Sequence, residues 1–143
     1  MYVDSAILVK LVVREADSLF YAEQIDGQTG VWSSAIALTE CWSALFRKQR
    51  EGAIGDATRR TAWQKLEHYV ADGALELVAV DRSILARANQ VIERCFPDVP
   101  LRSLDAIHLA SCEAIAGFPL LTNDGRMRAA ALHLKLPLGP LPH

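Results

Sequence analysis

The chain has 143 residues, of which 51% are hydrophobic and 22% are charged, and its formal net charge is −2. This length suits one domain, and the composition is typical of a globular protein with its own core. The slight excess of acid excludes a general electrostatic attraction to nucleic acid. Nucleic-acid binding would therefore depend on local groups of Arg and Lys.

The cysteines and the chain start indicate the compartment. Cys41, Cys95 and Cys112 are odd in number, widely spaced and outside any Cys-x-x-Cys pattern, which argues against a zinc site. We expect three small core residues in a reducing compartment. The first residues show no signal peptide, and no apolar run is long enough to span a membrane. A cytoplasmic protein without membrane contact is expected.

Short apolar stretches alternate with longer segments of helical periodicity. The stretches predict strands at residues 2–4, 31–33, 75–80 and 119–122, with residues 136–138 as a short additional edge strand. The periodic segments predict helices over residues 6–13, 17–25, 35–51, 56–72, 82–95, 103–115 and 125–134. Because no repeat or linker interrupts the alternation, we predict an α/β fold. It comprises one domain, residues 1–143, with a central parallel sheet of four to five strands flanked by helices.

Right-handed crossovers place the carboxyl ends of parallel strands on one edge of the sheet, where ligands bind in such folds. Asp4 ends the first predicted strand and Asp124 follows the fourth. Each has an ordinary alternative explanation, since Asp4 can be a turn acid and Asn123-Asp124-Gly125 can be turn chemistry. Ser5 is expected to cap the helix that follows Asp4.

Asp105 lies in the most informative stretch, Leu104–Ala110, within a predicted helix that is apolar on nearly every side. Such a helix is usually buried, so we expect the Asp105 charge to need compensation. The alternative is a first-turn acid after a Ser103 N-cap, which the helix dipole favours. Glu40 lies two turns into the helix after the second strand, off its apolar stripe, and alone could be merely solvated.

These four carboxylates converge if the first and fourth strands are neighbours in the sheet. Together they would repel one another and raise their own pKa values, and a divalent cation would relieve the repulsion. An all-oxygen site without positioned Cys or His suits Mg²⁺ or Mn²⁺. Such a site can activate water and stabilise the charge that develops on a phosphate ester.

The acidic segments resemble the four motifs of a PIN domain, most closely those of the VapC toxins. In chain order they are Val3–Leu11, Ser34 with Thr39 and Glu40, Leu101–Ala110, and Leu121–Asp124. The resemblance implies a Mg²⁺- or Mn²⁺-dependent endoribonuclease, a homodimer and inhibition by a VapB-type antitoxin. It implies that the catalytic, metal-binding residues are Asp4, Glu40, Asp105 and Asp124, supported by the hydroxyls of Ser5 and Thr122. Ala6 departs from the family, which often has a second hydroxyl there.

Several other side chains near the motifs have two readings. His108, one turn from Asp105, could orient that carboxylate or make a single hydrogen bond in the core. Arg47, two turns past Glu40, and Arg102, beside a strand-edge loop, are expected to contact RNA phosphate, although a plain solvated surface explains them too. Trp32, Trp42 and Trp63 lie in apolar stripes, which favours core or dimer packing over base stacking.

Three functions are compatible with this pattern. The leading hypothesis is a toxin ribonuclease that hydrolyses structured RNA such as transfer or ribosomal RNA. A housekeeping RNA-processing nuclease without an antitoxin would have the same residues. A non-catalytic nucleotide- or protein-binding module is disfavoured because neither GxGxxG nor GxxxxGK[ST] occurs.

Overall fold

A computed structural model describes all 143 residues and shows one sheet of four parallel strands. The strands are β1 (Tyr2–Val3), β2 (Val31–Ser34), β3 (Leu75–Val78) and β4 (Leu120–Leu121), in the order β3-β2-β1-β4. The predicted α/β class and the parallel sheet are confirmed. The additional edge strand amounts to a single parallel bridge between Leu138 and Leu120.

Seven helices connect and cover the strands, with ends close to the predicted residues. They are α1 (Ser5–Val12), α2 (Ser18–Ile25), α3 (Ile36–Arg50), α4 (Asp56–Ala71), α5 (Arg82–Cys95), α6 (Ser103–Ala114) and α7 (Gly125–His133). None of them combines the length and the apolar character that crossing a membrane requires.

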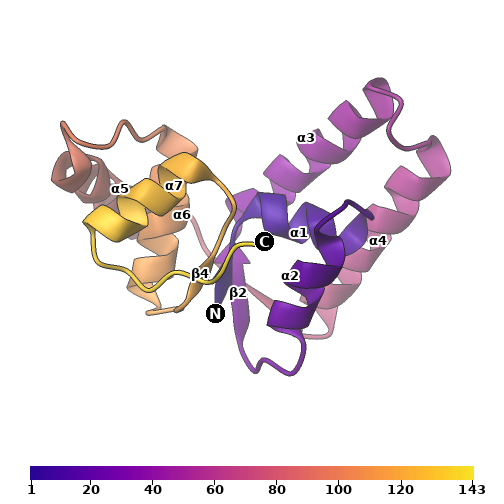
Figure 1. Ribbon diagram of the computed structural model, residues 1–143, viewed down its shortest axis with the longest axis horizontal. Helices are drawn as coiled ribbons and strands as arrows, with labels where there is room; N and C mark the ends of the chain where they lie inside the picture. Colours follow the sequence, from indigo (N-terminus) through magenta and orange to yellow (C-terminus); the bar gives the residue numbers. More distant parts are fainter.

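The two faces of the sheet are covered by different helices (Figure 1). Helices α5, α6 and α7 lie on one side, and α1 to α4 lie on the other, where α3 and α4 form a projecting hairpin. Successive residues of β1 and β4 alternate between the two cores: Tyr2 and Leu120 pack with the α5–α7 side, whereas Val3 and Leu121 pack with the α1–α4 side. This alternation is the period of two of a strand buried on both faces.

The register of β1 and β4 determines what lies at their carboxyl ends. Tyr2 is paired with Leu120 and Val3 with Leu121, so Asp4 and Thr122 are the next residues on the two strands. The Asp4 backbone N–H donates to the Leu121 carbonyl at 3.4 Å. The first and fourth strands are therefore neighbours, which is the condition set for convergence of the acids.

Candidate active site

Asp4 is the most buried carboxylate of the edge, with 2% of its surface exposed. It is also the N-cap of α1, because its Oδ1 accepts a hydrogen bond from the Ile7 backbone N–H at 3.0 Å; the expectation that Ser5 caps this helix was wrong. Its Oδ2 accepts a hydrogen bond from the Thr122 hydroxyl. Desolvation raises the pKa of Asp4, and Asp124 adds to the rise, against the hydrogen bonds from Thr122 and Ile7.

Thr122 joins the first and fourth acidic motifs through one buried hydroxyl. Its Oγ1 donates to Asp4 and accepts from the backbone N–H of Asp124 at 3.0 Å. Asp124 is exposed and caps α7, with its Oδ1 accepting from the Met127 N–H at 2.7 Å. The second carboxylate oxygen of Asp124 receives no hydrogen bond. A residue at position 122 thus determines where both acids lie.

Asp105 is only half-buried, so the expected fully buried charge in α6 was wrong. The apolar side of the helix begins one residue later, at Ala106, and Leu104 is 43% exposed. Asp105 Oδ2 accepts from the Arg102 backbone N–H at 3.3 Å, in a capping box whose N-cap is Arg102 rather than Ser103. Partial burial raises the pKa of Asp105, and Asp124 raises it further, whereas Arg126 and Arg102 oppose the rise.

Glu40 is held by a buried histidine rather than by solvent. His108 is 1% exposed; its Nε2 lies 2.6 Å from Glu40 Oε1, and its Nδ1 lies 2.8 Å from the Tyr2 hydroxyl. Burial raises the pKa of Tyr2 well above its ordinary value, so the phenol keeps its proton. Because a carboxylate only accepts hydrogen bonds, the Nε2–H of His108 donates to Glu40.

This arrangement differs from both sequence-based readings of His108. It makes two hydrogen bonds rather than one, and it contacts Glu40 rather than Asp105. A histidine one turn after Asp105 in an apolar helix was the only sequence signal. Its partners lie 68 and 106 residues away in the chain, beyond the reach of any local pattern.

The four predicted acids are therefore not equally close. Asp4 and Asp124 are joined through Thr122, and the charge of Asp124 adds to the rise in pKa that burial causes at Asp4 and at Asp105. Glu40 joins the edge through His108, which also lowers the pKa of Asp4. No three or more His, Cys, Asp and Glu side chains lie close enough together to form a compact metal-binding group.

Beside the acids is a hollow of about 440 Å³ between α1, α3 and the start of α6. Ser5, Glu40 and Arg47 line it, together with Ala6. Arg47 is exposed and forms no ion pair, so its guanidinium is available in this hollow. Arg102 is also exposed and lies at the N-cap of α6, three residues before Asp105.

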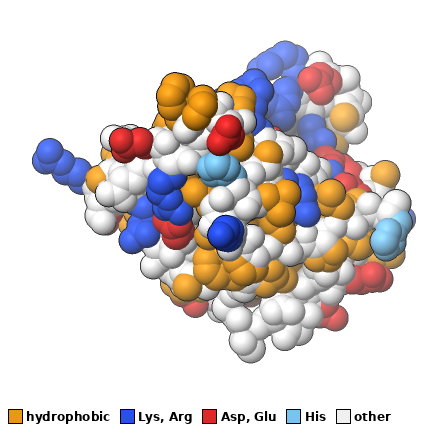
Figure 2. Space-filling view, turned by 60° about the vertical axis from the view of Figure 1, so that its left-hand side comes forward, with side chains coloured by type: hydrophobic (Ala, Val, Ile, Leu, Met, Phe, Trp, Pro, Cys, Tyr) orange, Lys and Arg blue, Asp and Glu red, His pale blue; other side chains and the backbone are white.

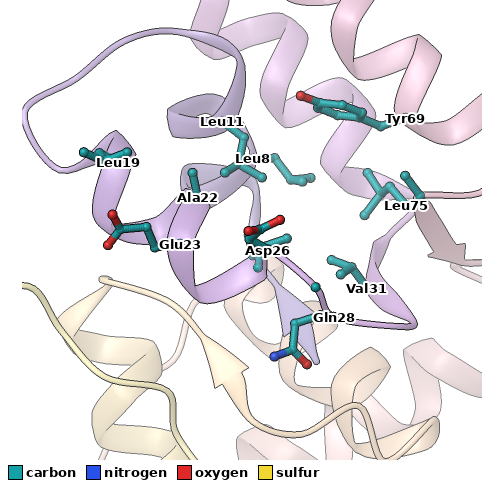
Figure 3. A pocket seen from close by; sticks show the side chains of 13 residues that line it. Leu8, Leu11, Leu19, Ala22, Glu23, Asp26, Gln28, Val31, Tyr69 and Leu75 are labelled. Carbon is teal, nitrogen blue, oxygen red and sulfur yellow. The ribbon is translucent and has the colours of Figure 1, made fainter.

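A separate hollow of about 550 Å³, shown in Figure 3, lies at the opposite end of the strands. Val31 and Leu75, the first residues of β2 and β3, line it with Leu8 and Leu11 of α1. Nine of its 13 lining residues are hydrophobic. Because the acids follow the carboxyl ends of β1 and β4, this hollow belongs to a different part of the molecule.

Comparison with known proteins agrees with this geometry. The family model described as PIN domain matches residues 1–132. Ribonuclease VapC46 of Mycobacterium tuberculosis is 34% identical over 133 residues, covering 92% of this chain and 89% of that protein. Ribonuclease VapC35 of the same species is 31% identical over 144 residues, covering 95% and 93%. The chain therefore belongs to the PIN domain family, and within it to the VapC type.

A solved structure has the same fold. A toxin–antitoxin complex from Klebsiella pneumoniae contains a chain that superposes with a TM-score of 0.58 at 16% sequence identity. The superposition covers 90% of this chain and 89% of that one. At this identity the likeness concerns the arrangement of strands and helices alone.

Proposed function

We propose that the protein is a Mg²⁺- or Mn²⁺-dependent endoribonuclease and the toxin of a VapBC-type toxin–antitoxin pair. One observation carries the proposal: Asp4 and Asp124 follow the neighbouring strands β1 and β4, and Thr122 Oγ1 makes a hydrogen bond with each of them. Burial raises the pKa values of Asp4 and Asp105, and the charge of Asp124 adds to both rises, so these carboxylates gain from a shared divalent cation. The VapC relatives are named ribonucleases, which supports RNA as the substrate.

The donor atoms fit a hard cation. Asp105 Oδ1 and Asp124 Oδ2 receive no hydrogen bond, so each leaves one carboxylate oxygen free for an ion, and Asp4 contributes the oxygen that Thr122 orients. We propose Asp4, Asp105 and Asp124, with Glu40 from α3, as the catalytic and metal-binding carboxylates. When bound, Mg²⁺ or Mn²⁺ supplies a water of lowered pKa and positive charge beside the phosphate.

The remaining residues of the site position these groups and the substrate. Thr122 orients Asp4 and Asp124 together, and His108 fixes the direction of Glu40. Ser5 lines the hollow that contains Glu40 and Arg47, where its hydroxyl can donate to a phosphate oxygen. We propose that Arg47 and Arg102 bind the RNA backbone, since guanidinium groups form bidentate hydrogen bonds with phosphate.

The biological setting follows from the same proposal. We infer a VapB-type antitoxin partner, a homodimer and a structured RNA target such as transfer or ribosomal RNA. The VapC names of the relatives favour this role over that of a housekeeping nuclease. We also infer a cytoplasmic location, because all three cysteines are free and buried, as expected in a reducing compartment.

Asp105→Asn tests the proposal. We expect the variant to keep its fold and to lose at least about a hundredfold of the cleavage rate on transfer RNA with Mn²⁺, since removed electrostatic groups cost on this order. Asp26→Asn is the matched control, because Asp26 is exposed and forms no ion pair. Calorimetric titration with Mn²⁺ provides a second readout, in which Asp105→Asn weakens binding and Asp26→Asn does not. Undiminished cleavage by Asp105→Asn would refute the proposed mechanism.

A further inference from the structure

A second hollow adjoins the one that contains Glu40. It measures about 560 Å³ and is lined by Trp42, Ser43, Phe46, Arg47 and Arg50, all on α3. Ser43 and Arg47 line both hollows, so the two are continuous along the helix. Ten residues separate Glu40 from Arg50, which is about 15 Å along a helix. The surface thus leads directly away from the proposed site.

Two aromatic rings form one wall of this second hollow. Trp42 is 44% exposed and Phe46 is 37% exposed, with their ring centroids 5.1 Å apart. Residues of α4 support them: Trp63 packs edge-on against Trp42 at 4.8 Å, and the Arg59 guanidinium lies 4.2 Å from the Phe46 ring centre. The expected packing role of Trp42 therefore accounts for only part of its surface. An aromatic wall, packed on its inner side against α4, remains open to solvent.

The charges beside this wall are positive and unpaired. Arg47 and Arg50 are exposed and form no ion pair, and no acid lines the hollow. Other cations of α3 and α4 are paired with acids: Lys48 lies 2.5 Å from Glu15, and Arg60 lies 3.1 Å from Asp56. In the space-filling view, Lys and Arg side chains gather at the top, at the height of the α3–α4 tip (Figure 2).

We propose that this hollow is a subsite for single-stranded RNA beside the cleaved phosphate. In it, a base stacks on Trp42 and Phe46, and Arg47 and Arg50 bind the adjoining phosphates. The inference rests on the proposed function for the identity of the substrate. Exposed aromatic rings interleaved with free guanidinium groups are the usual chemistry of single-strand binding. Two unpaired arginines complement a polyanion, in a chain whose overall charge gives no attraction to one.

The experiment measures binding without cleavage. The full chain is titrated in EDTA with a fluorescein-labelled 12-nucleotide single-stranded RNA of mixed sequence, and anisotropy is followed at several NaCl concentrations. Arg50→Gln is expected to weaken binding and to reduce the slope of log affinity against log salt by about 0.7, the value for one single-strand phosphate contact. Lys65→Gln, which removes an exposed charge from α4, is the matched control and is expected to bind like the wild type.

Trp42→Leu tests the stacking. We expect affinity to fall about tenfold, within the range found when a stacking aromatic is removed, and the quenching of tryptophan fluorescence on RNA binding to disappear. Phe96→Leu is the control, because Phe96 is a 79% exposed aromatic outside α3 and α4. If circular dichroism shows that Trp42→Leu is unfolded, Phe46→Leu and the surface change Arg50→Gln decide the question.

Two results would overturn the subsite. One is wild-type affinity and salt slope for both the Arg50 and the aromatic variants. The other is unchanged RNA binding with a loss of self-association in sedimentation, which would assign the aromatic wall to a contact between copies of the chain. Neither result bears on cleavage, whereas failure of the proposed function would appear as absent Mn²⁺-dependent hydrolysis with RNA binding intact.

Discussion

Replacing Asp4 by asparagine tests the electrostatics of the edge independently of RNA. Asp4 is 2% exposed, and burial is the largest cause of its raised pKa. Asparagine keeps the shape of the side chain: its Oδ1 can accept from the Ile7 N–H, and its amide can donate to the Thr122 hydroxyl oxygen. The substitution therefore removes a buried negative charge and keeps one hydrogen bond to each partner, but the buried Thr122 O–H loses its acceptor, which offsets part of the gain.

The expected gain in stability is modest because the charge is partly compensated. Burial of one carboxylate costs several kcal/mol in real proteins, on the order of magnitude of measured cases. The hydrogen bonds that Asp4 accepts from Ile7 and Thr122 stabilise the charged form by about 1.5 to 3 kcal/mol each, which offsets part of this cost. We expect Asp4→Asn to be more stable than the metal-free wild type at pH 7 by about 1 kcal/mol. This corresponds to about 2 to 4 °C in Tm for a domain of this size.

The pH dependence has a definite sign. Because the pKa of Asp4 is raised in the folded protein, the wild type binds this proton more tightly when folded than when unfolded. Its contribution to stability is present below the unfolded pKa of about 3.9 and is lost as the pH rises toward the folded value. The advantage of Asp4→Asn should therefore be absent in acid, grow through this window and stay constant above it. Urea titrations from pH 3.5 to 8 in EDTA measure it.

Added Mn²⁺ should reverse the order of the two proteins. At a concentration 100 times its Kd, a ligand that binds only the folded state stabilises it by about 2.7 kcal/mol. The wild type gains this amount, whereas Asp4→Asn lacks one of the proposed ligands and gains less. If Asp4→Asn is less stable than the wild type at pH 7 in EDTA, the Asp4 charge stabilises the metal-free fold and the reasoning is wrong. Asp26→Asn should change neither curve.

Two further substitutions test the surroundings of the site. Thr122→Val keeps the shape of the side chain but removes the donor to Asp4 and the acceptor for the Asp124 N–H. We expect it to lower the free energy of unfolding in urea by about 1 to 3 kcal/mol, and Thr122→Ser to recover the loss. An unchanged urea midpoint would contradict the two hydrogen bonds. Glu113 forms ion pairs with Arg87 and Arg94, and these arginines lower its pKa although partial burial acts to raise it. The contribution of the ionised Glu113 to stability is therefore present above its unfolded pKa of about 4.3 and is lost as the pH falls. Glu113→Gln should lower the free energy of unfolding by at most about 1 kcal/mol at pH 7, because both arginines are more than 40% exposed. If the same loss of stability persists at pH 3, the ion pairs are not its cause.

The sequence was sufficient for the elements because their signals are local. Apolar residues at helical spacing predicted the seven helices, and strands ending in Asp4 and before Asp124 predicted the edge at which both lie. The hydrogen bonds of His108 could not be predicted, since they depend on how α6 packs against β1 and α3. The burial of Asp105 was misjudged for a related reason: an apolar sequence does not tell where the first turn of a helix emerges from the core.

The caps of three helices explain how the metal-free protein holds three acids at one edge. Asp4 caps α1, Asp124 caps α7, and Asp105 is the third residue of the capping box of α6. Each carboxylate thus accepts a backbone N–H at a helix start, where the dipole favours negative charge. These N–H groups offset part of the repulsion that the sequence argument assigned wholly to a cation. Each acid taken alone is an ordinary helix-capping residue. What distinguishes this edge is that three helices begin beside β1 and β4, so that their capping acids share one place.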